Sequence, residues 1–286
     1  MMQGLRRQPA GLSKDLANKK RCLVVGVLNV TPDSFSDGGL FTDTTTAINH
    51  AKQLIAQGAD LIDVGGESTK PGVSRIENIE EQKRVIPVIE ELTNLGIITS
   101  IDTMRSQTAE LAVKAGAQIV NDVSGGLADE NMHKTVAGLN VPYVLMHWRG
   151  HSTVMDELAN YQNVVEEVTN ELKIQIEKAT KAGLSRNKIV IDPGLGFAKK
   201  PEHNWQILKE INKLHSLELP IYIGASRKRF LADFAFPKGS TDPKDRDLAT
   251  SAISSYASLN GAWAVRVHDV AGSVAAVKVT NQLEEI

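Results

Sequence analysis

The chain has 286 residues, of which 42% are hydrophobic and 23% are charged, so it can bury a large core as an ordinary globular protein. Its formal net charge of −2 gives no reason to expect nucleic acid or a membrane surface as a partner. The single cysteine, Cys22, excludes an intramolecular disulfide, and no apolar stretch has the length of a membrane span. We therefore expect a cytoplasmic protein, with Cys22 as a small core residue.

The first 20 residues carry five lysines or arginines against one aspartate and lack an apolar segment. This composition excludes a secretory signal peptide. We expect residues 1–20 to form a basic tail that is flexible or loosely docked, and residues 21–286 to form one catalytic domain.

Short apolar runs alternate with segments of helical periodicity along the rest of the chain, without a linker. The apolar runs are 24–28, 61–64, 97–101, 119–120, 144–146, 189–191, 221–223 and 265–267. The helical segments are 42–57, 76–94, 106–115, 130–138, 164–182, 205–214, 247–259 and 272–283. Such alternation predicts an α/β fold with a parallel sheet wrapped in helices. Eight units in about 265 residues fit a single (β/α)8 TIM barrel better than an open sheet.

A polar residue follows each apolar run. The carboxyl ends of barrel strands share one face, where active sites lie, so these residues are expected to meet there. One aspartate after a strand can be only a turn or a helix cap. The recurrence of Asn29, Asp102, Asn121 and Asp192 at this position favours a common site.

Four loops at the strand ends have the composition of binding loops. Those after the first and second strands, 29–39 and 65–72, are long and contain glycine, which is typical of lids. The seventh and eighth strands end in the basic stretches 226–229 and 266–269, in the region where this fold often binds phosphate. Arg227 in the former could instead pair with an acid at the barrel rim. No Cys/His cluster has zinc spacing, whereas an Asn with ligand phosphates suits Mg²⁺.

The same motifs closely resemble those of the dihydropteroate synthase family. They are Gly-Val-Leu-Asn-Val-Thr-Pro-Asp-Ser-Phe-Ser-Asp-Gly-Gly at 26–39, Asp-Val-Gly-Gly-Glu-Ser-Thr at 63–69, Asn-Asp-Val-Ser-Gly-Gly at 121–126, Asp-Pro-Gly-Leu-Gly-Phe at 192–197, Ser-Arg-Lys at 226–228 and Arg-Val-His-Asp-Val at 266–270. The resemblance covers 22–283, and residues 144–149 are similar to the actinobacterial branch. It implies condensation of 6-hydroxymethyl-7,8-dihydropterin pyrophosphate with p-aminobenzoate, giving 7,8-dihydropteroate and pyrophosphate.

The resemblance also implies a role for particular residues. It assigns pterin binding to Asp102, Asn121, Met146, Asp192, Phe197 and Lys228. It assigns the diphosphate to Asn29, Thr69, Arg266 and His268, with Asn29 also the Mg²⁺ ligand. It assigns p-aminobenzoate to Phe35, Thr69, Pro71, Ser226 and Lys228. The implied catalytic set is Asp102, Asp192, Lys228, Arg266 and His268. Two positions, Lys70 and Arg229, differ from the common family residues.

A dissociative, SN1-like mechanism is implied, because the dihydropterin ring can delocalise the cation that the departing pyrophosphate leaves. The resemblance further implies inhibition by sulfonamides and a homodimer formed through late helices. Two alternatives share the pterin site: a pterin-dependent methyltransferase and a paralogue that binds pterin without catalysis. Release of pyrophosphate that depends on Mg²⁺ separates the synthase from both.

Overall fold

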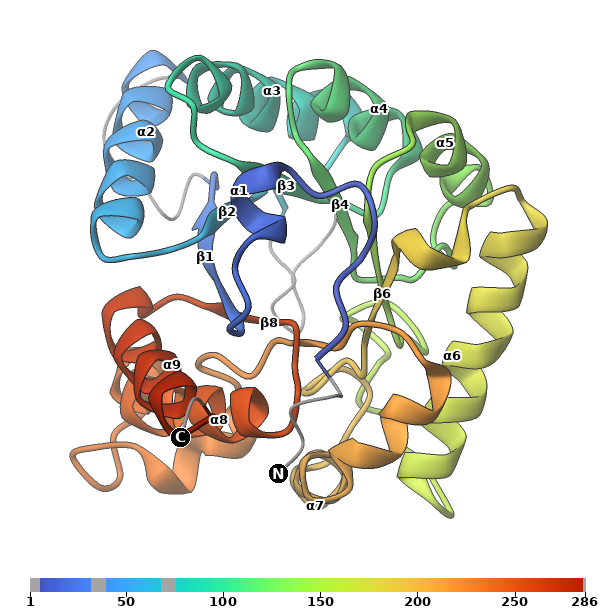
Figure 1. The fold of residues 1–286 in the computed structure, drawn as a ribbon, viewed down its shortest axis with the longest axis vertical. Coiled ribbons are helices and arrows are strands. Elements are labelled where there is room, and N and C mark those ends of the chain that lie inside the picture. Colours follow the sequence, from blue (N-terminus) through green and yellow to red (C-terminus); the bar gives the residue numbers. More distant parts are fainter. Residues whose placement is uncertain (1–5, 32–39, 68–75, 285–286) are drawn as a thin grey trace.

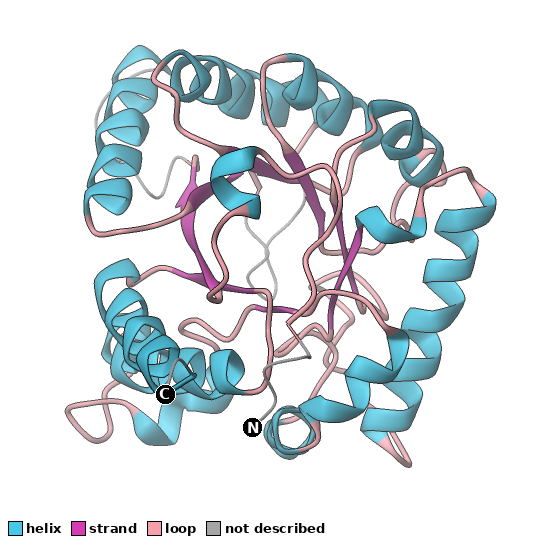
Figure 2. Ribbon diagram, in the orientation of Figure 1, coloured by secondary structure: helices cyan, strands magenta, loops and turns pink. Residues whose placement is uncertain are grey.

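The computed structural model describes residues 6–31, 40–67 and 76–284. Its parallel strands form a barrel inside a ring of helices (Figures 1 and 2), which confirms the predicted TIM barrel. The strands follow the order β6-β5-β4-β3-β2-β1-β8-β7. Their bounds are β1 Leu23–Asn29, β2 Leu61–Gly65, β3 Thr99–Asp102, β4 Ile119–Asp122, β5 Tyr143–Met146, β6 Ile189–Asp192, β7 Tyr222–Ile223 and β8 Ala264–Val267. A parallel bridge between Ile191 and Ile221 brings β6 next to β7.

Except for α1, which was not predicted, and α7, which begins and ends earlier, the helices lie where the periodicity predicts them, with small shifts at the ends. They are α1 Lys14–Ala17, α2 Leu40–Ala56, α3 Asn78–Asn94, α4 Ser106–Lys114, α5 Met132–Leu139, α6 Val164–Lys181, α7 Pro201–Lys209, α8 Asp247–Leu259 and α9 Val270–Glu284. Helix α7 begins earlier than predicted because Pro201 starts its first turn, where a missing N–H does no harm. Pro87 lies inside α3.

The barrel interior has an apolar layer at the amino ends of the strands and a polar layer at their carboxyl ends. Successive strand side chains point to opposite faces, so every second residue faces inward. The apolar layer consists of Leu23, Val25, Leu61, Ile119, Val144, Val190, Tyr222 and Ala264, with Leu16 and Trp263. The next inward positions on several strands are polar: Asp63, Asn121, Asp192 and Arg266. The pleat therefore concentrates polar groups at one end of the barrel.

Residues 6–20, which we expected to belong to a flexible or loosely docked tail, pack against the amino end of the barrel. Helix α1 lies across this opening (Figure 1), and its Leu16 is only 1% exposed within the apolar layer. Arg6 forms an ion pair with Glu284 of α9, with 2.9 Å between Nη1 and Oε2. The basic charge of this segment thus serves docking, and Leu16 supplies the apolar contact that the charge pattern did not reveal.

No helix in the described part of the chain combines the length and the apolar character needed to cross a bilayer.

The packing of α1 predicts a loss of stability when its buried side chain is shortened. Leu16→Ala should lower the free energy of unfolding by about 2–5 kcal/mol, because it removes a fully buried side chain and leaves a cavity. The exposed Lys14 of the same helix provides the control, and Lys14→Ala should change stability by less than about 0.5 kcal/mol. Urea denaturation measures both variants. Equal midpoints for the two would show that α1 does not stabilise the barrel.

Candidate active site

A fully buried carboxylate, Asp63 of β2, organises the polar layer. Its Oδ2 accepts hydrogen bonds from Arg266 Nε at 2.6 Å and from Asn121 Nδ2 at 3.0 Å. Its Oδ1 accepts a hydrogen bond from the hydroxyl of Ser100. Side chains from β2, β3, β4 and β8 are therefore joined through one group.

Arg266 links Asp63 to a second carboxylate, Asp102 at the end of β3. Arg266 Nη2 lies 2.7 Å from Asp102 Oδ2. Burial raises the pKa of Asp102, and the Arg266 guanidinium opposes that rise. Burial also disfavours the charged form of Arg266, but Asp63 and Asp102 outweigh it and raise the pKa of Arg266 above its usual value. The guanidinium stays charged and is held in place by both carboxylates.

Asp192 at the end of β6 forms a second polar centre with Lys228. Oδ1 of Asp192 accepts a hydrogen bond from the backbone N–H of Gly194 at 2.7 Å. Burial raises the pKa of Asp192, and the charge of Lys228 opposes that rise. Burial lowers the pKa of Lys228 to about 8, against the attraction of Asp192. Gly224 lies between the two groups, where a Cβ atom would be 3.7 Å from Asp192 Oδ2 and 3.9 Å from Lys228 Nζ.

The loop after β6 depends on glycine. Gly194 has φ +68°, and a Cβ atom there would lie 2.3 Å from the carbonyl oxygen of His147. Gly196 has φ +77°, and its Cβ atom would lie 2.7 Å from Cδ of Lys228. A side chain at either position would strain the backbone and collide with a neighbour. The Pro-Gly-Leu-Gly sequence thus allows the loop to approach Lys228 closely, and Lys228 donates a hydrogen bond to the carbonyl of Leu195.

An apolar surface lies beside these polar groups. Met146 packs with Met104 and Val123, and the partly buried Phe197 and Trp148 extend this cluster. Nζ of Lys228 lies 4.5 Å from the centre of the Phe197 ring. The combination of an apolar surface with nearby carboxylates and an amide suits a planar heterocycle that carries N–H groups.

The ends of β7 and β8 are joined through Ser226 and His268. The Ser226 hydroxyl oxygen lies 2.9 Å from His268 Nδ1. It also accepts a hydrogen bond from the backbone N–H of His268 at 3.1 Å. Arg227 forms an ion pair with Asp247, 2.7 Å between Nη2 and Oδ2, so it is the rim partner that the sequence left open. Arg229 pairs with Asp156 at the surface, 2.9 Å apart.

The structure therefore brings together most of the residues expected at the strand ends. Asn29 ends β1 and lies in register with Gly65, where a Cβ atom would be 3.5 Å from Asp102. Phe35, Thr69, Pro71 and Lys70 lie outside the described residues. Within the described part, no group of three or more His, Cys, Asp or Glu side chains is placed to hold a metal ion.

Sequence reasoning did not assign a role to Asp63 or to a second buried lysine, Lys199. Asp63 had a detectable signal, because a carboxylate inside the apolar run 61–64 must face the barrel interior or pair with a base. Lys199 had none, since a lysine in a loop is normally solvated.

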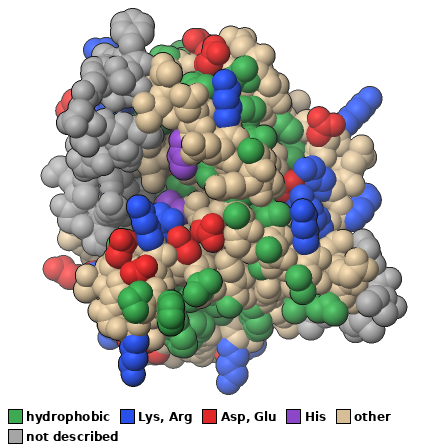
Figure 3. Space-filling model, turned by 90° about the vertical axis from the view of Figure 1, so that its left-hand side faces the viewer, with side chains coloured by type: hydrophobic (Ala, Val, Ile, Leu, Met, Phe, Trp, Pro, Cys, Tyr) green, Lys and Arg blue, Asp and Glu red, His purple; other side chains and the backbone are tan. Residues whose placement is uncertain are grey.

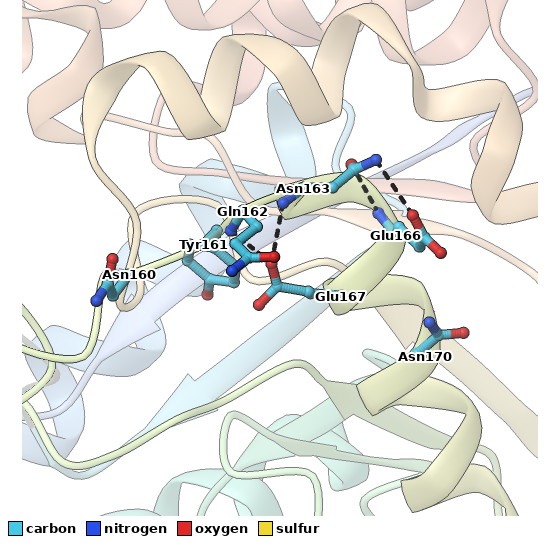
Figure 4. A pocket seen from close by; sticks show the side chains of 7 residues that line it. All are labelled: Asn160, Tyr161, Gln162, Asn163, Glu166, Glu167 and Asn170. Atoms are coloured by element: carbon cyan, nitrogen blue, oxygen red, sulfur yellow. Dashed lines mark hydrogen bonds between the residues drawn. The ribbon is translucent and has the colours of Figure 1, made fainter.

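A surface hollow of about 570 Å³ is lined by other residues than these strand ends. Figure 4 shows that polar side chains from the approach to α6 and its first turns line it, among them Tyr161, Glu167 and Asn170. None of the groups joined to Asp63 or Asp192 lines this hollow, and the strand ends remain the candidate active site.

Comparison with known proteins identifies the family of the chain. The profile of a family described as "Pterin binding enzyme" matches residues 25–268. The dihydropteroate synthase of the actinobacterium Mycobacterium leprae is 49% identical over 259 residues, covering 90% of this chain and 91% of that protein. The Xanthomonas albilineans dihydropteroate synthase with 4-aminobenzoic acid has a TM-score of 0.86 at 40% identity, over 93% of this chain and 94% of that one. The Yersinia pestis dihydropteroate synthase in complex with a sulfonamide drug has a TM-score of 0.87 at 35% identity, over 98% and 99%. The chain therefore belongs to the dihydropteroate synthase family of pterin-binding enzymes and is a transferase.

Proposed function

We propose that the chain condenses 6-hydroxymethyl-7,8-dihydropterin pyrophosphate with p-aminobenzoate, yielding 7,8-dihydropteroate and pyrophosphate for folate synthesis. The observation that carries this proposal is the buried Asp192, which lies near Lys228 and in register with Met146 of the apolar cluster. A pterin has both features that such a site recognises: a flat ring and an aminopyrimidinone edge rich in N–H donors.

The pterin is held at its edge and on its face. The Asp192 carboxylate accepts hydrogen bonds from the N–H groups of the aminopyrimidinone edge, while the amide of Asn121 can both donate and accept hydrogen bonds. Met146 and Phe197 pack on the ring, and Asp102 completes the polar set. Because Asn121 is fixed by Asp63, the edge meets groups that are already oriented.

Arg266 and His268 bind the diphosphate and stabilise the charge that develops as the C–O bond breaks. Their strand-end position supports this role, since both lie on β8 or directly after it. Asn29 fits as the protein ligand of Mg²⁺, because Mg²⁺ prefers oxygen ligands and needs only one or two from the protein when phosphates supply others. When bound, the ion neutralises charge on the leaving diphosphate. A dissociative reaction requires no nucleophile from the chain itself.

The amine of p-aminobenzoate attacks from the side of Ser226 and Lys228. The Xanthomonas albilineans complex with 4-aminobenzoic acid supports this second substrate, and the Yersinia pestis complex supports inhibition by sulfonamides. By the resemblance of the motifs, Phe35, Thr69 and Pro71 complete this subsite.

We infer a cytoplasmic homodimer that associates through α8 and α9. Three apolar side chains of these helices, Leu248, Val279 and Leu283, are 69%, 61% and 55% exposed. Figure 3 shows hydrophobic side chains gathered on the lower part of the face that carries these helices. A second copy would remove this apolar surface from water.

An assay of pyrophosphate release tests the proposed reaction. We expect release to require Mg²⁺ and p-aminobenzoate and to be matched by an equal amount of dihydropteroate. Asp192→Asn should lower kcat/KM by roughly 100-fold, because it replaces a charged acceptor by an amide that also donates. The control is Asp233→Asn at an exposed position, which should retain wild-type activity. Binding of the pterin without any release would instead favour the non-catalytic paralogue.

The role of Asp63 is tested against a matched carboxylate at the other end of the barrel. Asp60 is 1% exposed at its side chain and pairs with Arg21 at 2.7 Å, much as Asp63, 0% exposed, pairs with Arg266 at 2.6 Å. Asp63→Asn and Asp60→Asn should both destabilise the fold, by about 3–5 kcal/mol if each breaks its buried pair.

Only Asp63→Asn should also raise KM for the pterin pyrophosphate, by roughly tenfold, because Arg266 and Asn121 lose their common anchor. Steady-state kinetics and urea denaturation measure the two effects. Equal kinetic effects of the two substitutions would assign Asp63 a purely structural role.

A further inference from the structure

A second buried lysine, Lys199, lies close enough to Asp192, the proposed pterin anchor, for their charges to interact. Lys199 follows the loop after β6 and is 8% exposed. Its Nζ donates to the carbonyl oxygen of Phe197 at 3.1 Å and lies 2.9 Å from Nδ1 of His147. A buried ammonium is unfavourable unless its surroundings compensate for the lost water, so its retention requires an explanation.

Its contacts fix the tautomer of His147. An ammonium only donates, so Nδ1 of His147 must accept and the ring proton is on Nε2. Nε2 then donates to Glu171 Oε2 at 2.9 Å. Burial, reinforced by the charge of Lys199, lowers the pKa of His147 to about 4, and the ring stays neutral. Arg149 holds the same carboxylate through Nε at 3.1 Å.

Glu171, at the outer end of this chain of contacts, stays ionised and accepts hydrogen bonds from His147 and Arg149. Burial opposes its ionisation, but hydrogen bonds from His147 and Arg149 lower its pKa to about 2. The three groups form a continuous line from the half-exposed Glu171 through His147 to the buried Lys199.

The inner end of this line bears on the pterin site in two ways. Two lysines form hydrogen bonds to the same loop: Lys228 donates to the carbonyl of Leu195, and Lys199 donates to the carbonyl of Phe197. The positive charge of Lys199 also acts on Asp192, opposing the effect of burial on that carboxyl. In addition, the backbone N–H of His147 donates to the carbonyl of Asp192 at 2.8 Å.

We propose that Lys199 is a positioning residue of the pterin site: oriented by His147 and Glu171, its ammonium favours the carboxylate form of Asp192 and holds the loop that carries Phe197. This inference rests on the proposed function, because it assigns the pterin to Asp192.

The expected pH effect follows from the charges around both groups. Asp192 faces Lys228 after β7 and Arg266 of β8, besides Lys199. Lys199 faces His147, Arg149 after β5, Glu171 of α6, Asp192 and Lys228. Burial lowers the pKa of Lys199 to about 7, against the attraction of Asp192. Below that pH Lys199 is charged, so its removal must raise the pKa of Asp192, and a higher pH is then needed to ionise the pterin anchor.

The test is the pH profile of kcat/KM for the pterin pyrophosphate in Lys199→Met. We expect its acid limb to move up by about one pH unit, with a roughly tenfold higher KM on that limb and a much smaller change in kcat. Lys199→Arg keeps the charge and should return the limb towards its wild-type position. Lys209→Met, on the exposed side of α7, is the matched control and should leave the profile unchanged.

A folded Lys199→Met protein with the wild-type profile would overturn the proposal, as would an Arg variant shifted as far as the Met variant. If Lys199→Met does not fold, Glu171→Gln serves instead, because its side chain is 35% exposed. It should shift the acid limb in the same direction, since Glu171 favours the charged form of Lys199, while Glu177→Gln on an exposed part of α6 should not. An unshifted Glu171→Gln profile would contradict the proposal.

Failure of the proposed function is a separate outcome. A wild-type protein that binds the pterin pyrophosphate without turnover would refute the synthase activity. The pH dependence of binding, measured by calorimetry on the same variants, would still test Lys199.

Discussion

The ion pair between Asp63 and Arg266 is the interaction on which the carboxyl end of the barrel depends. Both groups leave water on folding, and their attraction offsets the loss of hydration only because the geometry is close and further hydrogen bonds satisfy the remaining oxygens. One oxygen of Asp63 serves both Arg266 and Asn121, which come from distant parts of the sequence. Two groups that would meet the substrate are thus oriented before it binds.

The apolar end of the barrel makes this polar layer effective. Leu16 closes the amino end and completes a layer of aliphatic and aromatic side chains beneath the charges. Charges above such a layer are poorly solvated, which is why burial raises the pKa of Asp192 and lowers that of Lys228. The same weak solvation strengthens every contact that a substrate makes there. Stability and function are therefore divided between the two ends of the same strands.

The sequence was sufficient for the architecture and for the expectation that several polar side chains gather at the strand ends. Apolar runs followed by polar residues define a barrel because strand ends must share a face, and this rule alone predicts that Asp102, Asn121 and Asp192 lie near one another. The docking of residues 6–20 on the barrel could not be predicted from the sequence, because a single leucine between basic residues forms no periodic pattern. Asp63 was visible as a charge within a strand, but its partner Arg266 is 203 positions away. Lys199 required the fold itself, since only the fold places His147 and Glu171 around it.

The central claim is that Asp63 and Arg266 act as one unit in binding the pterin pyrophosphate. A double-mutant cycle with Asp63→Asn, Arg266→Gln and the combined variant tests this most directly, with the binding free energy of that substrate measured by calorimetry. We predict a coupling free energy of more than about 1 kcal/mol, with the double variant little worse than Arg266→Gln alone. Additive effects of the two substitutions would contradict the account, because Asp63 would then contribute to binding independently of the guanidinium that it holds.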